Sequence, residues 1–291
     1  MVRIADRSRS VPIVTRQSLV GLDWLKGDIG ELRRAYETAC RVMPERAAWQ
    51  AIEIDGRLLG LLIHRPSQPR DEKYVIIYFH GGGWIVGSPL THADISGALC
   101  ELTGIEVISV DYRLAPEHVA PAPIEDGLAT IEHVLTGMRD RSVILCGDSA
   151  GAAIALAVAS RYERIEGVAA CYGSYGLFES ESLRLFGSRA NGIDADCIRR
   201  MWMAAHASSE ASPYSIEELA GTISVPVYVL TGNRDPVRDD SLVLANALKV
   251  RGGNVVLDVV RDQGHGFLHG GLGDSAAASA LTRISHWMMS L

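Results

Sequence analysis

The stretch of sequence that decides the fold is "CGDSAGAAIALA", residues 146–157. It places Ser149 between a short apolar run, 142–146, and a long run of small residues, with a glycine two positions away on either side. This pattern predicts a strand that ends in a sharp turn and continues as a helix. Two interpretations are open from these residues alone: Ser149 is a nucleophile held up on the turn, or it is the polar cap of a buried helix.

The length and composition of the chain limit the classes of function that it can have. Its 291 residues are 47% hydrophobic, which is enough to bury a large core. The formal net charge is -7 and no basic block is present, so we expect no nucleic-acid partner. The most apolar segment, residues 150–160, is about half as long as a membrane span requires, and no apolar stretch of signal-peptide length follows the N-terminus. We therefore expect neither a membrane association nor export.

The five cysteines give a prediction about the compartment. Their number is odd and none of them forms a CxxC pair. This pattern is typical of cysteines that stay reduced in a protein core, so we expect a cytoplasmic protein.

Short β-branched runs alternate with helical patterns along most of the chain, which predicts an α/β protein with a mostly parallel sheet flanked by helices. The expected strands are 74–82, 104–114, 142–149, 165–173, 225–233 and 254–262, and the expected helices are 91–103, 123–136, 150–161 and 238–251. Residues 49–66 predict an antiparallel hairpin that turns at Asp55-Gly56.

Two segments interrupt this alternation. Residues 1–47 contain a helical pattern that precedes the sheet, and residues 174–212 break the expected strand order. We expect both to form a helical cap over a catalytic domain made of residues 48–173 and 213–291.

Polar residues follow four of the expected strands. HGGGW (80–84) brings three glycines whose bare backbone N–H groups can approach a ligand closely, although a flexible connector has the same composition. Ser149, Asp235 and His265 each follow a later strand. Carboxyl ends of parallel strands meet at one edge of a sheet, and the order glycine loop, serine, acid, histidine is that of an α/β-hydrolase site. These coinciding signals favour Ser149 as a nucleophile.

A metal site is not expected in the last of these loops. His265 and His269 are four residues apart, a spacing that pairs metal ligands on a helix, but the glycines around them argue against a helix. We expect neither a metal nor an organic cofactor.

The chain resembles the hormone-sensitive-lipase-like family of α/β-hydrolase esterases. The resemblance is carried by HGGGW (80–84), DYRLAPE (111–117), GDSAG (147–151), DPVRD (235–239) and HGF (265–267), which together span about two-thirds of the chain. The chain departs from the family in the residues that follow GDSAG and in the expected cap segments.

The resemblance implies a role for each matched residue. Ser149 is the nucleophile, His265 its general base and Asp235 the acid that orients the histidine. The backbone N–H groups of Gly82, Gly83 and Ala150 form the oxyanion hole. His80 shapes the glycine loop, and the family's cap corresponds to the two segments that break the alternation.

The function implied is a serine carboxylesterase that hydrolyses short- to medium-chain esters through an acyl-enzyme. Trp84, Met201 and Trp202 are candidates for the substrate pocket, although such a cluster is also typical of core packing. Two alternatives stay open: an amidase or formamidase with the same residues, and a non-catalytic ligand-binding protein, a role that one relative of the family adopted when it lost its histidine. The family also makes a homodimer plausible.

Overall fold

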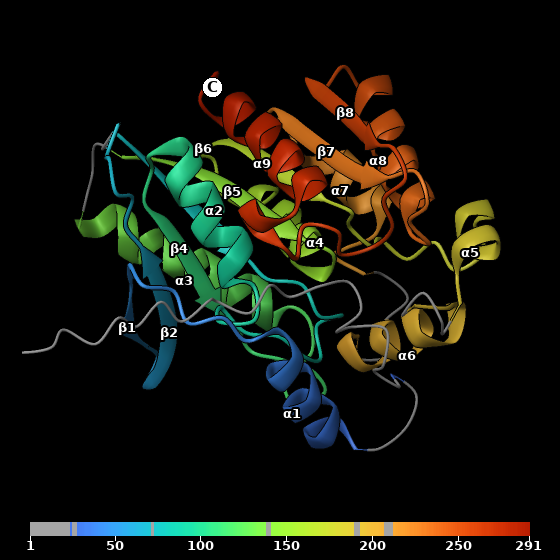
Figure 1. Cartoon of the computed structure of the whole chain (residues 1–291), viewed down its shortest axis with the longest axis horizontal. Coiled ribbons are helices and arrows are strands. Elements are labelled where there is room, and N and C mark those ends of the chain that lie inside the picture. The colour runs from blue at the N-terminus through green and yellow to red at the C-terminus, as the bar shows by residue number, and fades with distance from the viewer. Residues whose placement is uncertain (1–23, 25–27, 71–72, 138–140, 189–192, 207–211) are drawn as a thin grey trace, which may run out of the picture.

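The computed structural model describes residues 24, 28–70, 73–137, 141–188, 193–206 and 212–291. A central sheet runs through the molecule with helices on both sides (Figure 1). Its strands are β1 (Ala47–Ile54), β2 (Arg57–His64), β3 (Tyr74–Phe79), β4 (Val107–Asp111), β5 (Ser142–Asp148), β6 (Ile165–Cys171), β7 (Val227–Gly232) and β8 (Val255–Val260). Their order in the sheet is β1-β2-β4-β3-β5-β6-β7-β8.

Only the entry to this sheet is antiparallel. β2 pairs antiparallel with both β1 and β4, and the strands from β4 to β8 pair in parallel. The β1-β2 hairpin turns at Asp55 and Gly56, whose φ angles of 50° and 77° are those of a type I′ turn. The predicted α/β architecture, its strands and this turn are confirmed.

Helices cover the two faces of the sheet because both faces are apolar. The side chains of β3 alternate: Ile76 and Tyr78 pack in one core, and Val75, Ile77 and Phe79 in the other. The first core is closed by α2 (Ala93–Thr103) and α9 (Ser275–Met288), and the second by α3 (Ala122–Gly137), α4 (Ala150–Ala159) and α8 (Arg238–Val250). Every residue of α4 is buried, so the small side chains of this helix let it lie against the sheet.

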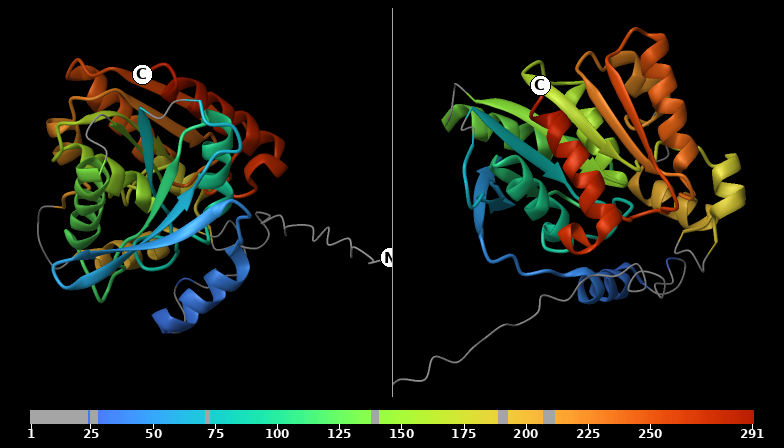
Figure 2. Two further views of the ribbon diagram at one scale, coloured as in Figure 1. Left: turned by 90° about the vertical axis from the view of Figure 1, so that its left-hand side faces the viewer. Right: turned by 45° about the horizontal axis from the view of Figure 1, so that its top comes forward.

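In the described parts of the chain, four further α-helices lie outside this alternation: α1 (Ile29–Cys40), α5 (Glu181–Phe186), α6 (Ala195–Ala205) and α7 (Ile216–Thr222). α1 and α6 lie together below the sheet, beyond the carboxyl ends of the parallel strands (Figures 1 and 2). Arg33 ties α1 to the loop after β3, because its Nε donates to the carbonyl of Ile85 at 2.8 Å. Within the described part of the chain, no helix has the length and apolar character needed to cross a membrane.

Candidate active site

Ser149 lies on a strained turn between β5 and α4. Its φ and ψ are 52° and -120°, which a non-glycine residue adopts only when the surroundings enforce it. A Cβ on Gly147 would collide with the backbone of Gly151, and a Cβ on Gly151 would collide with the backbone of Phe79, so both glycines are required for the turn. The side chain of Ser149 makes no hydrogen bond that caps α4. The helix-cap interpretation is therefore wrong, and the hydroxyl is free for another partner.

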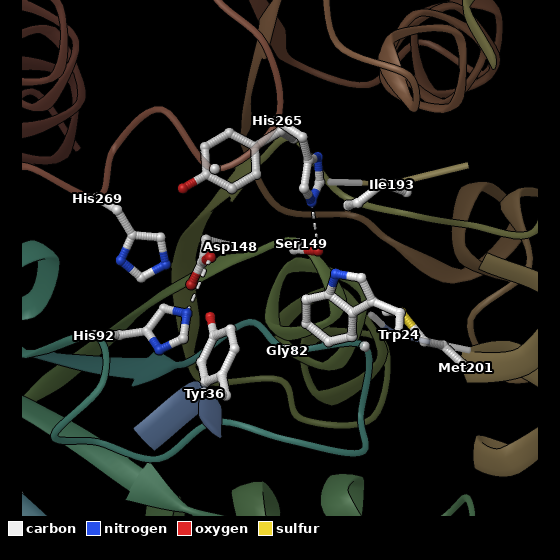
Figure 3. Close-up of a pocket in the computed structure, with 13 residues that line it drawn as sticks. Trp24, Tyr36, Gly82, His92, Asp148, Ser149, Ile193, Met201, His265 and His269 are labelled. Carbon is white, nitrogen blue, oxygen red and sulfur yellow. Dashed lines mark hydrogen bonds and ion pairs between the residues drawn. The ribbon is translucent and has the colours of Figure 1, made fainter. Parts of the chain in front are cut away.

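That partner is His265, in the loop after β8. Ser149 Oγ and His265 Nε2 are 2.9 Å apart, and His265 Nδ1 lies 3.1 Å from each carboxylate oxygen of Asp235. Asp235 is fully buried, and its Oδ1 also accepts the backbone N–H of Val237 at 2.8 Å. The structure thus brings the three predicted residues together in one chain of contacts (Figure 3 shows the Ser149 to His265 contact).

The surroundings of His265 adjust its pKa. Burial alone lowers the pKa of this imidazole, but the negative charge of Asp235 and its hydrogen bond outweigh that effect. The pKa of His265 therefore lies above its ordinary value of 6.5. An imidazole that Asp235 orients and makes more basic is suited to take a proton from Ser149.

The glycine loop lies opposite this hydroxyl. Gly82 and Gly83 have φ angles of 113° and 59°, and both line the same cavity as Ser149. Among the described residues, neither of their N–H groups donates to another backbone group, and Ala150 begins α4 directly after the serine. His80 is buried and its Nδ1 lies 2.8 Å from the Gly81 carbonyl, in keeping with its predicted role in shaping the loop. Burial lowers the pKa of His80 to about 4, so the ring is neutral.

A cavity of about 70 Å³ opens in front of Ser149. One side is apolar and comes largely from the segments 1–47 and 174–212, and the other side is polar. Its lining consists of Trp24, Tyr36, Gly82, Gly83, His92, Asp148, Ser149, Tyr172, Ile193, Met201, His265, Gly266 and His269. Segments far apart in the sequence therefore meet at the serine.

The three predicted pocket residues have different positions. Met201, on α6, lines the cavity. Trp84 is buried and lines a smaller hollow of about 20 Å³ that also borders Ser149. Trp202 lines neither of these hollows: it packs edge-on against Trp84, with ring centroids 5.6 Å apart, and stacks on His206. Its assignment to the pocket is corrected to a supporting position behind Trp84.

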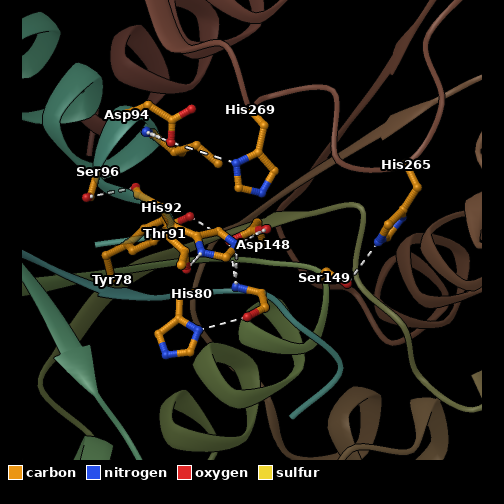
Figure 4. Close-up of polar contacts among 12 residues, drawn as sticks. Tyr78, His80, Thr91, His92, Asp94, Ser96, Asp148, Ser149, His265 and His269 are labelled. Carbon is orange, nitrogen blue, oxygen red and sulfur yellow. Dashed lines mark hydrogen bonds and ion pairs between the residues drawn. The ribbon is translucent and has the colours of Figure 1, made fainter. Parts of the chain in front are cut away.

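The polar side of the cavity contains residues that the sequence did not predict. Asp148, which precedes the serine, accepts from the Tyr78 hydroxyl at 2.6 Å and from the Gly81 N–H at 2.9 Å, and so fixes the glycine loop (Figure 4). Burial raises its pKa. The rings of His92 and His269 lie 4.5 Å apart next to it. His92 and Tyr36 carry no local motif, because they reach the cavity only through contacts between distant elements.

Comparison with known proteins agrees with this geometry. A sequence profile of the α/β-hydrolase fold matches residues 76–269. The chain is 32% identical over 237 residues to carboxylic ester hydrolase LipN of Mycobacterium tuberculosis, a match that covers 72% of this chain and 62% of that protein. It is 32% identical over 227 residues to an acetyl esterase of Salmonella schwarzengrund, covering 72% and 70% of the two chains.

A solved structure is similar over nearly the whole length. The hyperthermophilic esterase from the archaeon Pyrobaculum calidifontis superimposes with a TM-score of 0.82 at 25% identity, covering 94% of this chain and 96% of that one. The fold and the site thus define an α/β hydrolase. Together with the sequence matches, they show that the chain belongs to the hormone-sensitive-lipase-like esterase family of that fold.

Proposed function

We propose that the protein is a serine carboxylesterase that hydrolyses short- to medium-chain esters through an acyl-enzyme. The observation that carries the proposal is the unbroken line of contacts from Ser149 through His265 to the buried Asp235. The named relatives, a carboxylic ester hydrolase and an acetyl esterase, support the ester bond as the target.

In the first half of the reaction, Ser149 Oγ attacks the ester carbonyl while His265 Nε2 takes the hydroxyl proton. The negative charge that develops on the carbonyl oxygen is stabilised by the N–H groups of Gly82, Gly83 and Ala150. His265 then gives its proton to the leaving alcohol, and the acyl group stays on Ser149.

In the second half, His265 removes a proton from water, which attacks the acyl-enzyme. The intermediate collapses to release the carboxylic acid, and the proton returns to Ser149. Throughout, Asp235 holds the imidazole with Nδ1–H toward itself and stabilises the imidazolium form.

The size of the cavity favours the shorter acyl chains of the proposed range. Its volume of about 70 Å³ has room for a small group, and Trp24, Ile193 and Met201 give it an apolar wall. Because all three of these residues belong to the segments 1–47 and 174–212, we propose that both segments act as the cap that sets chain length.

The test is the rate of hydrolysis of p-nitrophenyl esters from acetate to decanoate by the parent protein and by Ser149→Ala. We expect the fastest turnover with short chains and a loss of about three or more orders of magnitude in the variant. Ser160→Ala, a half-buried serine at the end of α4, is the matched control and should keep the parent rate. A Ser149→Ala protein that retains most of the activity would exclude the proposed nucleophile.

The remaining expectations also stay proposals. All five cysteines are buried, which supports a reducing cytoplasm as the compartment. Paired ester and anilide substrates of one acyl group separate an esterase from an amidase, and the complete set of contacts around His265 speaks against a role in binding alone. Light scattering at micromolar concentration tests the predicted homodimer.

A further inference from the structure

We propose that His92, Asp148 and His269 form a binding site for a divalent transition-metal ion of the zinc type at the polar end of the cavity. One ligand atom from each residue can be chosen so that all three lie within 4.8 Å of one another. All three side chains are buried, and all three line the cavity that contains Ser149 (Figure 3).

The hydrogen bonds around His92 make the nitrogen beside this site an electron-pair donor, which also accepts the Gly81 N–H at 3.2 Å. The Thr91 hydroxyl donates to the Ser88 carbonyl at 2.9 Å, so at its 2.8 Å contact with His92 Nδ1 it accepts a proton. This network assigns the ring proton to Nδ1, and Nε2 is the unprotonated nitrogen. His92 Nε2 lies 3.6 Å from Asp148 Oδ2, which brings two electron-pair donors side by side.

The two carboxylate oxygens of Asp148 have different neighbours. Its Oδ1 receives the Tyr78 hydroxyl and the Gly81 N–H, whereas its Oδ2 faces His92. The Gly81 N–H also reaches His92 Nε2, at 3.2 Å, but its shorter bond to Asp148 Oδ1 is 2.9 Å long. That shorter bond would hold the glycine loop in place when a cation takes the lone pair of His92.

His269 completes the set from the other side (Figure 4). Its Nδ1 lies 3.8 Å from Asp94 Oδ1, and the second oxygen of Asp94 is fixed by the Gly270 N–H at 2.9 Å. A histidine that ligates a metal commonly directs its other ring nitrogen to a carboxylate or a backbone carbonyl. Thr91 already provides an oxygen of this kind for His92. His269 Nδ1 makes no hydrogen bond with the described residues, and Asp94, at 3.8 Å, would become its partner if the ring moved closer.

The donor set selects the class of ion. Two imidazole nitrogens and one carboxylate oxygen suit zinc and neighbouring transition metals, whereas calcium and magnesium prefer oxygen ligands. Ligand atoms about 2.1 Å from a tetrahedral ion lie about 3.4 Å apart. The contact between His92 and Asp148 already has nearly this length, and an ion would draw in the ligand atom of His269 from at most 4.8 Å.

Occupation of the site would block the esterase reaction. The cavity is only about 70 Å³ in volume, and the ion would share it with Ser149 and His265. Zinc should therefore act as a reversible inhibitor. This consequence rests on the proposed function, whereas the binding itself does not.

The test is isothermal titration of the chelator-treated full chain with zinc chloride, next to esterase inhibition over the same concentrations. We expect one ion per chain with a micromolar or lower Kd. His269→Asn should weaken binding at least tenfold, and His133→Asn, an exposed histidine on α3, should bind like the parent. If the protein hydrolyses no ester, the titration still decides whether the metal site exists.

A crystal of the parent protein soaked in zinc gives a second readout that does not depend on any variant's folding. An anomalous peak between His92, Asp148 and His269 would support the site. The proposal is overturned if the parent binds no zinc, if His269→Asn binds as tightly as the parent while folded, or if the anomalous peaks lie only elsewhere on the protein.

Discussion

At the scale of single residues, the account depends on how Asp235 and His265 interact. Asp235→Asn removes the charge that raises the pKa of His265 and leaves burial, which lowers it. We expect kcat to fall by about four orders of magnitude, because the imidazole loses its tautomer and its counter-charge. The base must be neutral to act, so kcat/KM should fall as the pH is lowered. The midpoint of this fall should lie above pH 6.5 in the parent and at a lower pH in the variant. Measurement of kcat/KM as a function of pH for both proteins tests this shift.

The control for that experiment is Asp274→Asn. Asp274 caps α9, and asparagine is an equally good cap, so its pH profile should match the parent's. An unchanged acid limb in Asp235→Asn would show that the carboxylate does not tune His265.

The sequence predicted those residues that stand at strand ends in local motifs. Ser149, Asp235 and His265 were found in this way because strand, turn and glycine pattern are written in adjacent residues. Tyr36 and His269 were not assigned to the cavity, because their positions depend on packing between distant elements. Trp202 was misplaced for the same reason: an aromatic residue on a helix does not reveal which neighbour it faces.

At the scale of elements, the turn between β5 and α4 requires glycine. Gly151→Ala would drive a methyl group into the backbone of Phe79, so we expect the free energy of unfolding to fall by about 1–3 kcal/mol, measured by urea denaturation. Gly221→Ala is the matched control on α7, where the added Cβ meets nothing closer than Arg251 Nη1 at 3.7 Å. There the higher helix propensity of alanine should stabilise the protein by up to about 1 kcal/mol. Equal effects of the two changes would contradict the described turn.

α6 provides a paired test of the proposed cap. Met201 lines the cavity, whereas Met203, two residues further along the helix, is 76% exposed. Met201→Ala should enlarge the cavity and shift the optimum of p-nitrophenyl esters toward longer acyl chains, and Met203→Ala should leave it unchanged. If the two variants keep the same chain-length profile, Met201 does not limit the acyl pocket.

At the scale of the whole molecule, buried neutral histidines make stability depend on pH. His64 is 3% exposed and hydrogen-bonded to Ser96, and burial lowers its pKa from 6.5 to about 4. Between these values the unfolded chain binds the proton and the folded one does not, so stability is lost as the pH falls from 6.5 toward 4.

The variant His64→Gln should not show this loss. Relative to the variant, the parent should lose about 2–3 kcal/mol of unfolding free energy between pH 7.0 and pH 4.5, measured by urea denaturation. His133→Gln, at an exposed site, should show the pH dependence of the parent. Parallel curves for the parent and His64→Gln would mean that His64 becomes protonated in the folded state.

The overall architecture was predictable because a parallel sheet leaves long apolar runs separated by helical ones, as in β3 and β5. The proposed cap corresponds in the sequence only to two interruptions of that pattern, since the packing of α1 and α6 near the site involves few local signals. Its division from the catalytic domain stays a prediction.

The central claim, that Ser149 forms the covalent intermediate, is tested most directly by labelling. The protein is treated with one equivalent of a p-nitrophenyl alkylphosphonate, digested, and mapped by mass spectrometry. The account predicts one phosphonyl group per chain, attached to Ser149, with p-nitrophenol released in equal amount. A label on another residue, or no label on Ser149 in protein that hydrolyses esters, would contradict it.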